Sequence, residues 1–118
     1  MGKRRRERDA GSGARTERLQ ELIREELSFL LRHEIRDPRL DGVEITMVEL
    51  AGECARVWFS TKREGDARDE IEALDRAAGF FRANLAESLG LKRTPDLRFK
   101  RDRATRMFGP GSGTDTES

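Results

Sequence analysis

The stretch from Asp66 to Phe99 constrains the fold more than any other part of this 118-residue chain. Its apolar residues recur at intervals of three and four, which predicts one face of a long helix. They are Ile71, Leu74, Ala78, Phe81, Leu85 and Leu89. Asp66 is suited to cap the start of this helix, and Gly90 followed by Leu91 is typical of a left-handed helix end. The sequence therefore predicts a helix of about 24 residues, or about 36 Å, with both ends marked.

Small residues interrupt the middle of that helix at Ala77, Ala78 and Gly79. A helix of about 36 Å is longer than a strand of about six residues, which spans about 20 Å, so we expect the helix to bend. Gly79 costs roughly 1 kcal/mol relative to alanine inside a helix. Two compatible interpretations follow. Either the small residues let another element pack closely, or the bend exposes backbone N–H groups that a phosphate can approach.

The other periodic segments predict one more helix and three strands. An apolar stripe begins after Thr16 and predicts a helix that ends by Asp37, because the residue before Pro38 is pushed out of the helical region. A turn over 37–42 follows. Alternating apolar residues then predict strands over 43–47 and 55–60, joined by a hairpin at 51–53, and a last strand over 96–101. In this alternation Met47 belongs to the buried phase of its strand and Trp58 to the polar phase.

The order of helix, strand, strand, broken helix and strand predicts an α+β fold. The hairpin makes one strand pair antiparallel, and the long connection through the broken helix favours a right-handed crossover to a parallel last strand. We expect a three-stranded mixed sheet with helices packed on one face and the other face open. The predicted domain covers residues 15–103, between a disordered basic arm at 1–14 and a disordered glycine-rich tail at 104–118.

The net charge of +1 conceals a strong segregation of charge along the chain. Residues 1–15 contain six basic and two acidic residues, and residues 91–106 contain seven basic and two acidic residues. Local potential rather than net charge steers association, so this pattern favours binding to a polyanion. The alternative is a charged surface that is merely solvated.

Several classes of protein are disfavoured by what the sequence lacks. It has no run of about 18 apolar residues and no apolar segment behind the basic N-terminus, which argues against a membrane span or a secretory signal. We expect a cytoplasmic monomer. A single cysteine, Cys54, and a single histidine, His33, disfavour a disulfide, a metal site or an enzyme, and we expect no cofactor. Trp58 either covers the sheet beneath a helix or tail, or offers a stacking surface to a base.

Four segments carry a resemblance to a known family. They are Asp37-Pro38-Arg39-Leu40, residues 55–60, residues 73–82 and residues 91–99. Together they make residues 15–102 similar to the type II KH fold and, within it, to the ribosome-binding factor A family. The resemblance implies that Ala77-Ala78-Gly79 takes the place of the Gly-x-x-Gly loop of ordinary KH domains. A kinked helix lies where that loop would be. Asp75, where the family often has asparagine, and the short glycine-rich tail depart from the family pattern.

The resemblance implies an assembly factor without catalytic chemistry of its own. It implies binding to free small (30S) ribosomal subunits and their 16S rRNA, and assistance in late maturation, including 16S rRNA processing. We expect phosphate contacts that recognise RNA shape. The candidate RNA-binding residues are Lys3, Arg4, Arg5, Arg6, Arg8, Arg76, Ala77, Ala78, Gly79, Arg82, Lys92, Arg93, Arg98, Lys100 and Arg101. The alternative function is a protein–protein interaction module in which the basic ends are incidental.

Overall fold

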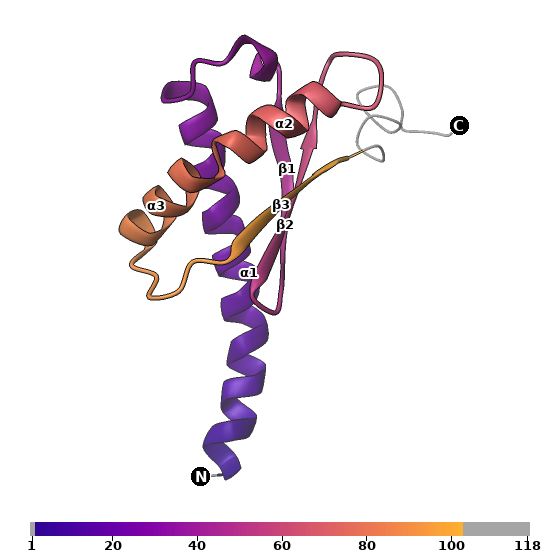
Figure 1. Ribbon diagram of the computed structural model, residues 1–118. Coiled ribbons are helices and arrows are strands. Elements are labelled where there is room, and N and C mark those ends of the chain that lie inside the picture. The colour runs from indigo at the N-terminus through magenta and orange to yellow at the C-terminus, as the bar shows by residue number, and fades with distance from the viewer. Residues whose placement is uncertain (1, 103–118) are drawn as a thin grey trace, which may run out of the picture.

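The computed structural model describes residues 2–102, with side chains described from residue 14 onward. It consists of three helices, a short 3-10 helix and three strands (Figure 1). In chain order the elements are α1 (Gly2–His33), η1 (Pro38–Leu40), β1 (Glu44–Ala51), β2 (Cys54–Ser60), α2 (Arg68–Arg76), α3 (Ala78–Leu89) and β3 (Asp96–Arg101). The predicted α+β class and order of elements are confirmed.

The three strands form one mixed sheet in the order β1-β2-β3. The tight turn at Gly52 and Glu53 makes β1 and β2 antiparallel, and the crossover through α2 and α3 makes β2 and β3 parallel. Because β2 is central, β3 is an edge strand of the sheet that the described residues form. The last strand has the predicted bounds.

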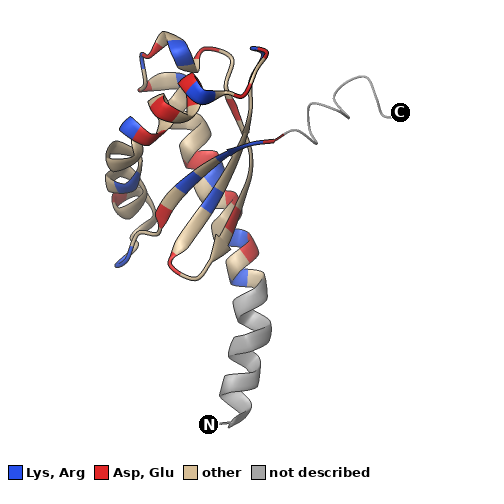
Figure 2. Cartoon of the chain, turned by 45° about the vertical axis from the view of Figure 1, so that its right-hand side comes forward, with Lys and Arg blue, Asp and Glu red and all other residues tan. Residues whose placement is uncertain are grey.

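The helices cover one face of the sheet. Buried side chains of all three helices pack with the inward residues of the strands in a single core. This core contains Ile23, Leu27, Leu74, Phe81 and Leu85 from the helices and Val48, Ala55, Val57, Phe59, Leu97 and Phe99 from the strands. Figure 2 gives an oblique view of the opposite face of the sheet, with the strands in front of α1. Within the described residues that other face has no helix over it, so the predicted open face is confirmed.

The first strand departs from the predicted alternation. The register of β1 against β2 shifts between Ile45 and Met47, which marks a bulge. The extra residue turns the next side chains over, so that Val48 is buried while Met47 is 47% exposed. The prediction that Met47 faces the core is therefore wrong.

The first helix also differs from its predicted bounds. It ends at His33, before the turn, but it begins at Gly2 rather than at Thr16. Arg15 and Glu17 on either side of Thr16 are good helix formers, so nothing there stops the helix. The proposed boundary between an arm at 1–14 and the domain stays a prediction, as does that of the tail at 104–118.

The long helix is broken at the predicted position. Helix α2 ends at Arg76 and α3 begins at Ala78, with Ala77 between them at φ −86° and ψ 0°. Gly90 ends α3 in the left-handed conformation, with φ 64°, and the N–H of Leu91 donates to the carbonyl of Ala86. The predicted helix end is confirmed. At the other end the cap position is Ala67 rather than Asp66, whose carboxylate accepts the N–H of Arg68 at 3.1 Å.

Candidate nucleic-acid interface

The break between α2 and α3 leaves backbone donors at the start of α3. The N–H of Ala77 still donates to the carbonyls of Ala73 and Leu74, both at 3.1 Å, and the N–H of Phe81 begins the hydrogen bonding of α3 by donating to Ala77 at 2.9 Å. The three intervening N–H groups belong to the first turn, and no side chain caps it. The first turn of a helix favours an anion, because its N–H groups and the helix dipole act together.

Gly79 lies in open space on this turn. A Cβ atom added there meets nothing within 4 Å among the described residues. The close-packing interpretation is therefore wrong for Gly79, whereas Ala77 and Ala78 are half-buried against the core. The three small residues therefore differ in role. The two alanines pack inward, and the glycine leaves the backbone exposed.

Arg98 and Lys100 form the basic part of the β3 edge. Their positions alternate with buried Leu97 and Phe99, so both side chains face the solvent. Neither takes part in an ion pair within residues 14–102. Figure 2 shows basic positions side by side on β2 and β3.

A groove joins this edge to helix α2. Its lining comes from α2 and from both parallel strands: Cys54, Arg56, Ile71, Asp75, Arg98, Phe99 and Lys100. The groove thus extends from the last turn of α2, next to the helix break, to the basic residues of β3. Sequence reasoning missed Arg56 as a member, although its alternation with buried Val57 indicated an outward position.

Arg101 is turned into the protein, and this removes the basis for predicting an RNA contact. It is only 8% exposed. Its guanidinium donates to the carbonyl of Gly65 and, at 3.0 Å, to the carbonyl of Arg63. Arg101 therefore fastens the loop before α2 to the end of β3.

Arg82 is also engaged within the protein. It donates to the carbonyls of Thr94 at 3.0 Å and Pro95 at 3.2 Å, and its guanidinium lies 3.7 Å from the Asp96 carboxylate. These contacts position the connection between α3 and β3. A direct RNA contact would compete with them.

The remaining candidate residues do not form one cluster. Arg76 lies next to the break, 3.8 Å from Glu72, and its side chain is 73% exposed. Lys92 and Arg93 lie beyond the other end of α3, which at twelve residues is about 18 Å long. Arg93 is 3.4 Å from Glu53, and both side chains are 86% exposed, so this pair is weak.

The side chains of the N-terminal candidates, Lys3, Arg4, Arg5, Arg6 and Arg8, lie outside the described residues. Their predicted contact with RNA stays a prediction.

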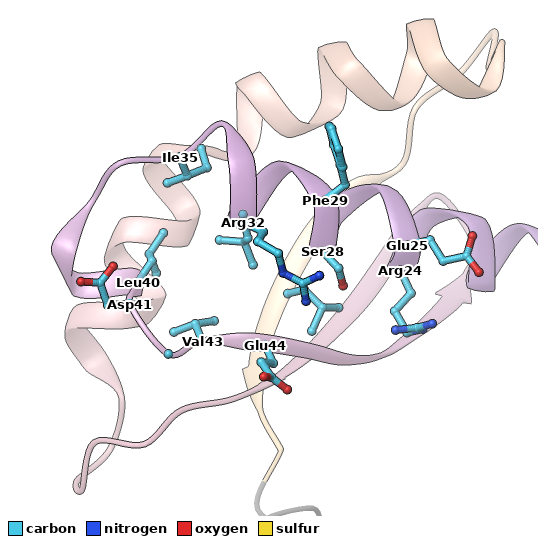
Figure 3. Close-up of a pocket in the computed structure, with 13 residues that line it drawn as sticks. Arg24, Glu25, Ser28, Phe29, Arg32, Ile35, Leu40, Asp41, Val43 and Glu44 are labelled. Carbon is cyan, nitrogen blue, oxygen red and sulfur yellow. The ribbon is translucent and has the colours of Figure 1, made fainter.

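A second hollow lies between the last turns of α1 and the segment that leads into β1. Figure 3 shows Arg32 extending across it toward the strand that carries Glu44, while Phe29 points away. Arg24, at its rim, forms an ion pair with Glu21. This mixture of charges does not continue the basic edge, so we assign the hollow no role in the interface.

Two other kinds of feature are absent from the described residues. No helix among them has the length and apolar character needed to cross a membrane. Residues 14–102 contain no group of three or more metal-binding side chains.

The sheet, the crossover and the broken helix define a type II KH-like domain with a basic strand edge beside its helix break. The family model for ribosome-binding factor A matches residues 15–108. The chain belongs to the ribosome-binding factor A family.

Individual relatives agree with this assignment. Ribosome-binding factor A of Azotobacter vinelandii is 39% identical over 99 residues, covering 79% of this chain and 77% of the relative. That of Vesicomyosocius okutanii is 44% identical over 92 residues, covering 76% and 80%.

Solved structures show the same fold. The crystal structure of ribosome-binding factor A from Thermus thermophilus has a TM-score of 0.68 and 27% identity, covering 75% of this chain and 97% of that one. A homology model of the Thermus thermophilus protein, fitted into the cryo-EM map of a 30S–RbfA complex, has a TM-score of 0.63 over the same shares.

Proposed function

We propose that this protein binds the free small ribosomal subunit through its 16S rRNA and assists late maturation of the subunit, including 16S rRNA processing. The observation that carries the proposal is the basic edge of β3, with Arg98 and Lys100 unpaired within the described residues, joined by a groove to a helix break of the family type. The relative seen in the 30S–RbfA complex supports the choice of partner. A factor with this role works in the cytoplasm, by binding rather than by catalysis.

Two kinds of contact serve this role. Arg98 and Lys100 neutralise phosphates along the β3 edge, and the first turn of α3 accepts a phosphate on free N–H groups beside Gly79. Arg76 adds charge at the break. Lys92 and Arg93 reach a different part of the RNA, and the N-terminal basic residues extend the contact. Arg82 and Arg101 act indirectly, by holding the loops that carry these groups.

The competing function is docking of a protein partner. The exposed apolar side chains on the helices favour it: Phe29 is 50%, Phe80 41% and Leu22 39% exposed. A complex formed on that surface would not depend on the β3 edge.

Co-sedimentation with separated subunits distinguishes the two functions. Reversing the charge at Arg98 and Lys100 to glutamate is expected to abolish binding to small subunits, while large subunits bind neither protein. Arg68→Glu is the matched control, because its side chain is 85% exposed and lies at the far end of α2. Retained binding by the double variant would exclude the RNA interface and favour the protein-docking function.

A further inference from the structure

Two adjacent rows of side chains cross the three strands on the open face of the sheet. Met47, Trp58 and Lys100 are register partners in one row. Glu49, Arg56 and Arg98 are register partners in the next. One row therefore places an aromatic ring between an exposed thioether and an ammonium group, and the other is entirely charged.

Trp58 offers carbon rather than nitrogen to the solvent. The residue is half-buried. Its indole Nε1 is buried and has no hydrogen-bond partner among the described residues. Whatever part of the ring is exposed is therefore its apolar framework, which suits stacking and not hydrogen bonding. No helix of the described residues lies over this face of the sheet, so the prediction that a helix covers Trp58 is wrong, whereas cover by the tail stays a prediction.

The charges around Trp58 favour a polyanion. Glu49 lies 3.2 Å from Arg56, and Asp96 lies 3.7 Å from Arg82, so two nearby acidic groups already have partners. Arg98 and Lys100 have no ion-pair partner within residues 14–102. Two cations without an ion-pair partner in the described part of the chain thus lie on the β3 side of this aromatic surface.

The chain's own C-terminal segment is the rival occupant, since it follows β3, which ends at Arg101. The first charged residues after Asp102 are Arg103 and Arg106. They would bring further positive charge toward Arg98 and Lys100, which repels them. A nucleic-acid backbone has the complementary charge, and unpaired bases supply the flat surface that an indole ring stacks on.

We propose that the open face of the sheet binds an unpaired nucleotide of a single-stranded RNA segment. The base stacks on Trp58 between Met47 and Lys100, and the flanking phosphates lie on Arg98 and Lys100. Stacking requires a base that is free of a duplex, so this face selects single-stranded segments, whereas the contacts at the helix break read only backbone shape. The inference rests on the proposed RNA-binding function and adds to it a preference for unpaired bases.

Trp58 is the only tryptophan of the chain, so its fluorescence reports on this face alone. The full-length protein is titrated with a short single-stranded oligoadenylate, with a duplex RNA of the same length, and with inorganic polyphosphate. We expect saturable quenching by the oligoadenylate only. Equal quenching by polyphosphate would show that charge, not stacking, changes the emission, and would overturn the proposal.

Variants of Trp58 test how much its ring contributes to the binding free energy. The affinity is measured by the fluorescence anisotropy of a labelled oligoadenylate. Trp58→Leu is expected to weaken binding about tenfold, within the range for losing one stacked base. Trp58→Phe is expected to restore most of the affinity. Phe29→Leu is the matched control, since it removes an exposed aromatic ring from α1. Unchanged affinity in a folded Trp58→Leu protein would overturn the proposal.

The remaining outcomes separate this inference from its rival and from the proposed function. Phe108 is an aromatic residue of the C-terminal segment. If Phe108→Ser shifts the tryptophan emission of the free full-length protein, and oligoadenylate does not quench the emission of the wild type, the C-terminal segment is the occupant and the proposal fails. If oligoadenylate does not stack on Trp58 but charge reversal at Arg98 and Lys100 still abolishes small-subunit binding, the stacking proposal fails and the proposed function is retained. If oligoadenylate stacks on Trp58 but small subunits bind the charge-reversal variant at Arg98 and Lys100 as well as they bind the wild type, the proposed function fails and the stacking proposal stands.

Discussion

Among single residues, two arginines of strand β3 have opposite roles. Arg98 and Arg101 both belong to β3, but three positions along a strand place them on opposite faces. Arg98 faces the solvent without an ion-pair partner within residues 14–102, whereas Arg101 bonds to loop carbonyls in the interior. Only the first is suited to contact a ligand directly.

We expect Arg101→Met to lower the free energy of unfolding by about 2 kcal/mol, because hydrogen bonds from a charged group to two carbonyls are lost. Arg98→Met is the matched control and should leave stability within about 0.5 kcal/mol of the wild type. Urea denaturation of both variants measures the difference. Equal stability of the two variants would contradict the assigned role of Arg101.

Gly79 allows stability and binding to be separated. Because a Cβ there meets no described atom within 4 Å, Gly79→Ala is expected to raise the free energy of unfolding by up to about 1 kcal/mol through helix propensity. The same methyl group covers the first turn of α3, so binding to small subunits should weaken. Thermal unfolding and co-sedimentation measure the two effects. A more stable variant that binds as well as the wild type would exclude close approach of RNA at Gly79.

At the scale of elements, short connections set the positions of the helices. The 3-10 helix η1 begins at Pro38 and packs beside α2. Asp37 caps it by accepting the N–H of Arg39 at 3.0 Å, and the Arg39 guanidinium returns to the same carboxylate at 2.9 Å. Arg39 also lies 3.6 Å from Glu72 of α2, so this connection links the end of α1 to the broken helix.

The Asp37 cap predicts a pH dependence of stability. The hydrogen bond from the Arg39 side chain, followed by that from its backbone, lowers the pKa of Asp37 below its ordinary value of 3.8. A carboxylate with a lowered pKa in the folded state adds stability that is fully present above the ordinary value and is lost as the pH falls through the folded value.

We therefore expect Asp37→Asn to be less stable than the wild type at neutral pH, with the difference shrinking below about pH 4. Thermal unfolding across that range measures it. Glu44→Gln removes an exposed carboxylate with no ion pair among the described residues and serves as the control. A stability difference that does not change with pH would contradict the role of this carboxylate.

At the scale of the whole molecule, the basic groups occupy separate regions. Arg76 lies at the helix break, Lys92 and Arg93 lie beyond the far end of α3, and Arg98 and Lys100 lie on the open side of β3. The acidic residues concentrate in the middle of the chain, where many pair with nearby arginines. A ligand that contacts all three basic regions has to extend across the domain, as a folded RNA does.

Binding through phosphates should depend steeply on salt. Replacing Arg98 and Lys100 together by alanine is expected to lower the slope of log affinity against log salt by about 1.5, since each phosphate contact contributes about 0.7 to 0.9. Arg68→Ala should leave the slope unchanged. Titrations of small subunits at several salt concentrations measure it. A weaker affinity with an unchanged slope would indicate that the two residues act without neutralising phosphates.

The kinds of element and their order followed from the sequence alone. Periodicity predicted the hairpin, the bounds of β3, the break at Ala77 and the end of α3 at Gly90, because these signals are carried by neighbouring residues. The chain's match to one family also follows from the sequence. The outward direction of Arg98 and Lys100 followed from strand alternation alone.

Which groups are free to act depends on how the elements pack. Packing turned Arg101 inward, engaged Arg82 with the loop before β3 and exposed Met47 through a bulge. Among the described residues it also left open space over Gly79 and no helix over Trp58. Each of these outcomes depends on segments far apart in the chain, such as the carbonyl of Gly65 that accepts from Arg101. Spacing along a sequence fixes the phase of a side chain on its own element, but its partners are set by how the elements pack.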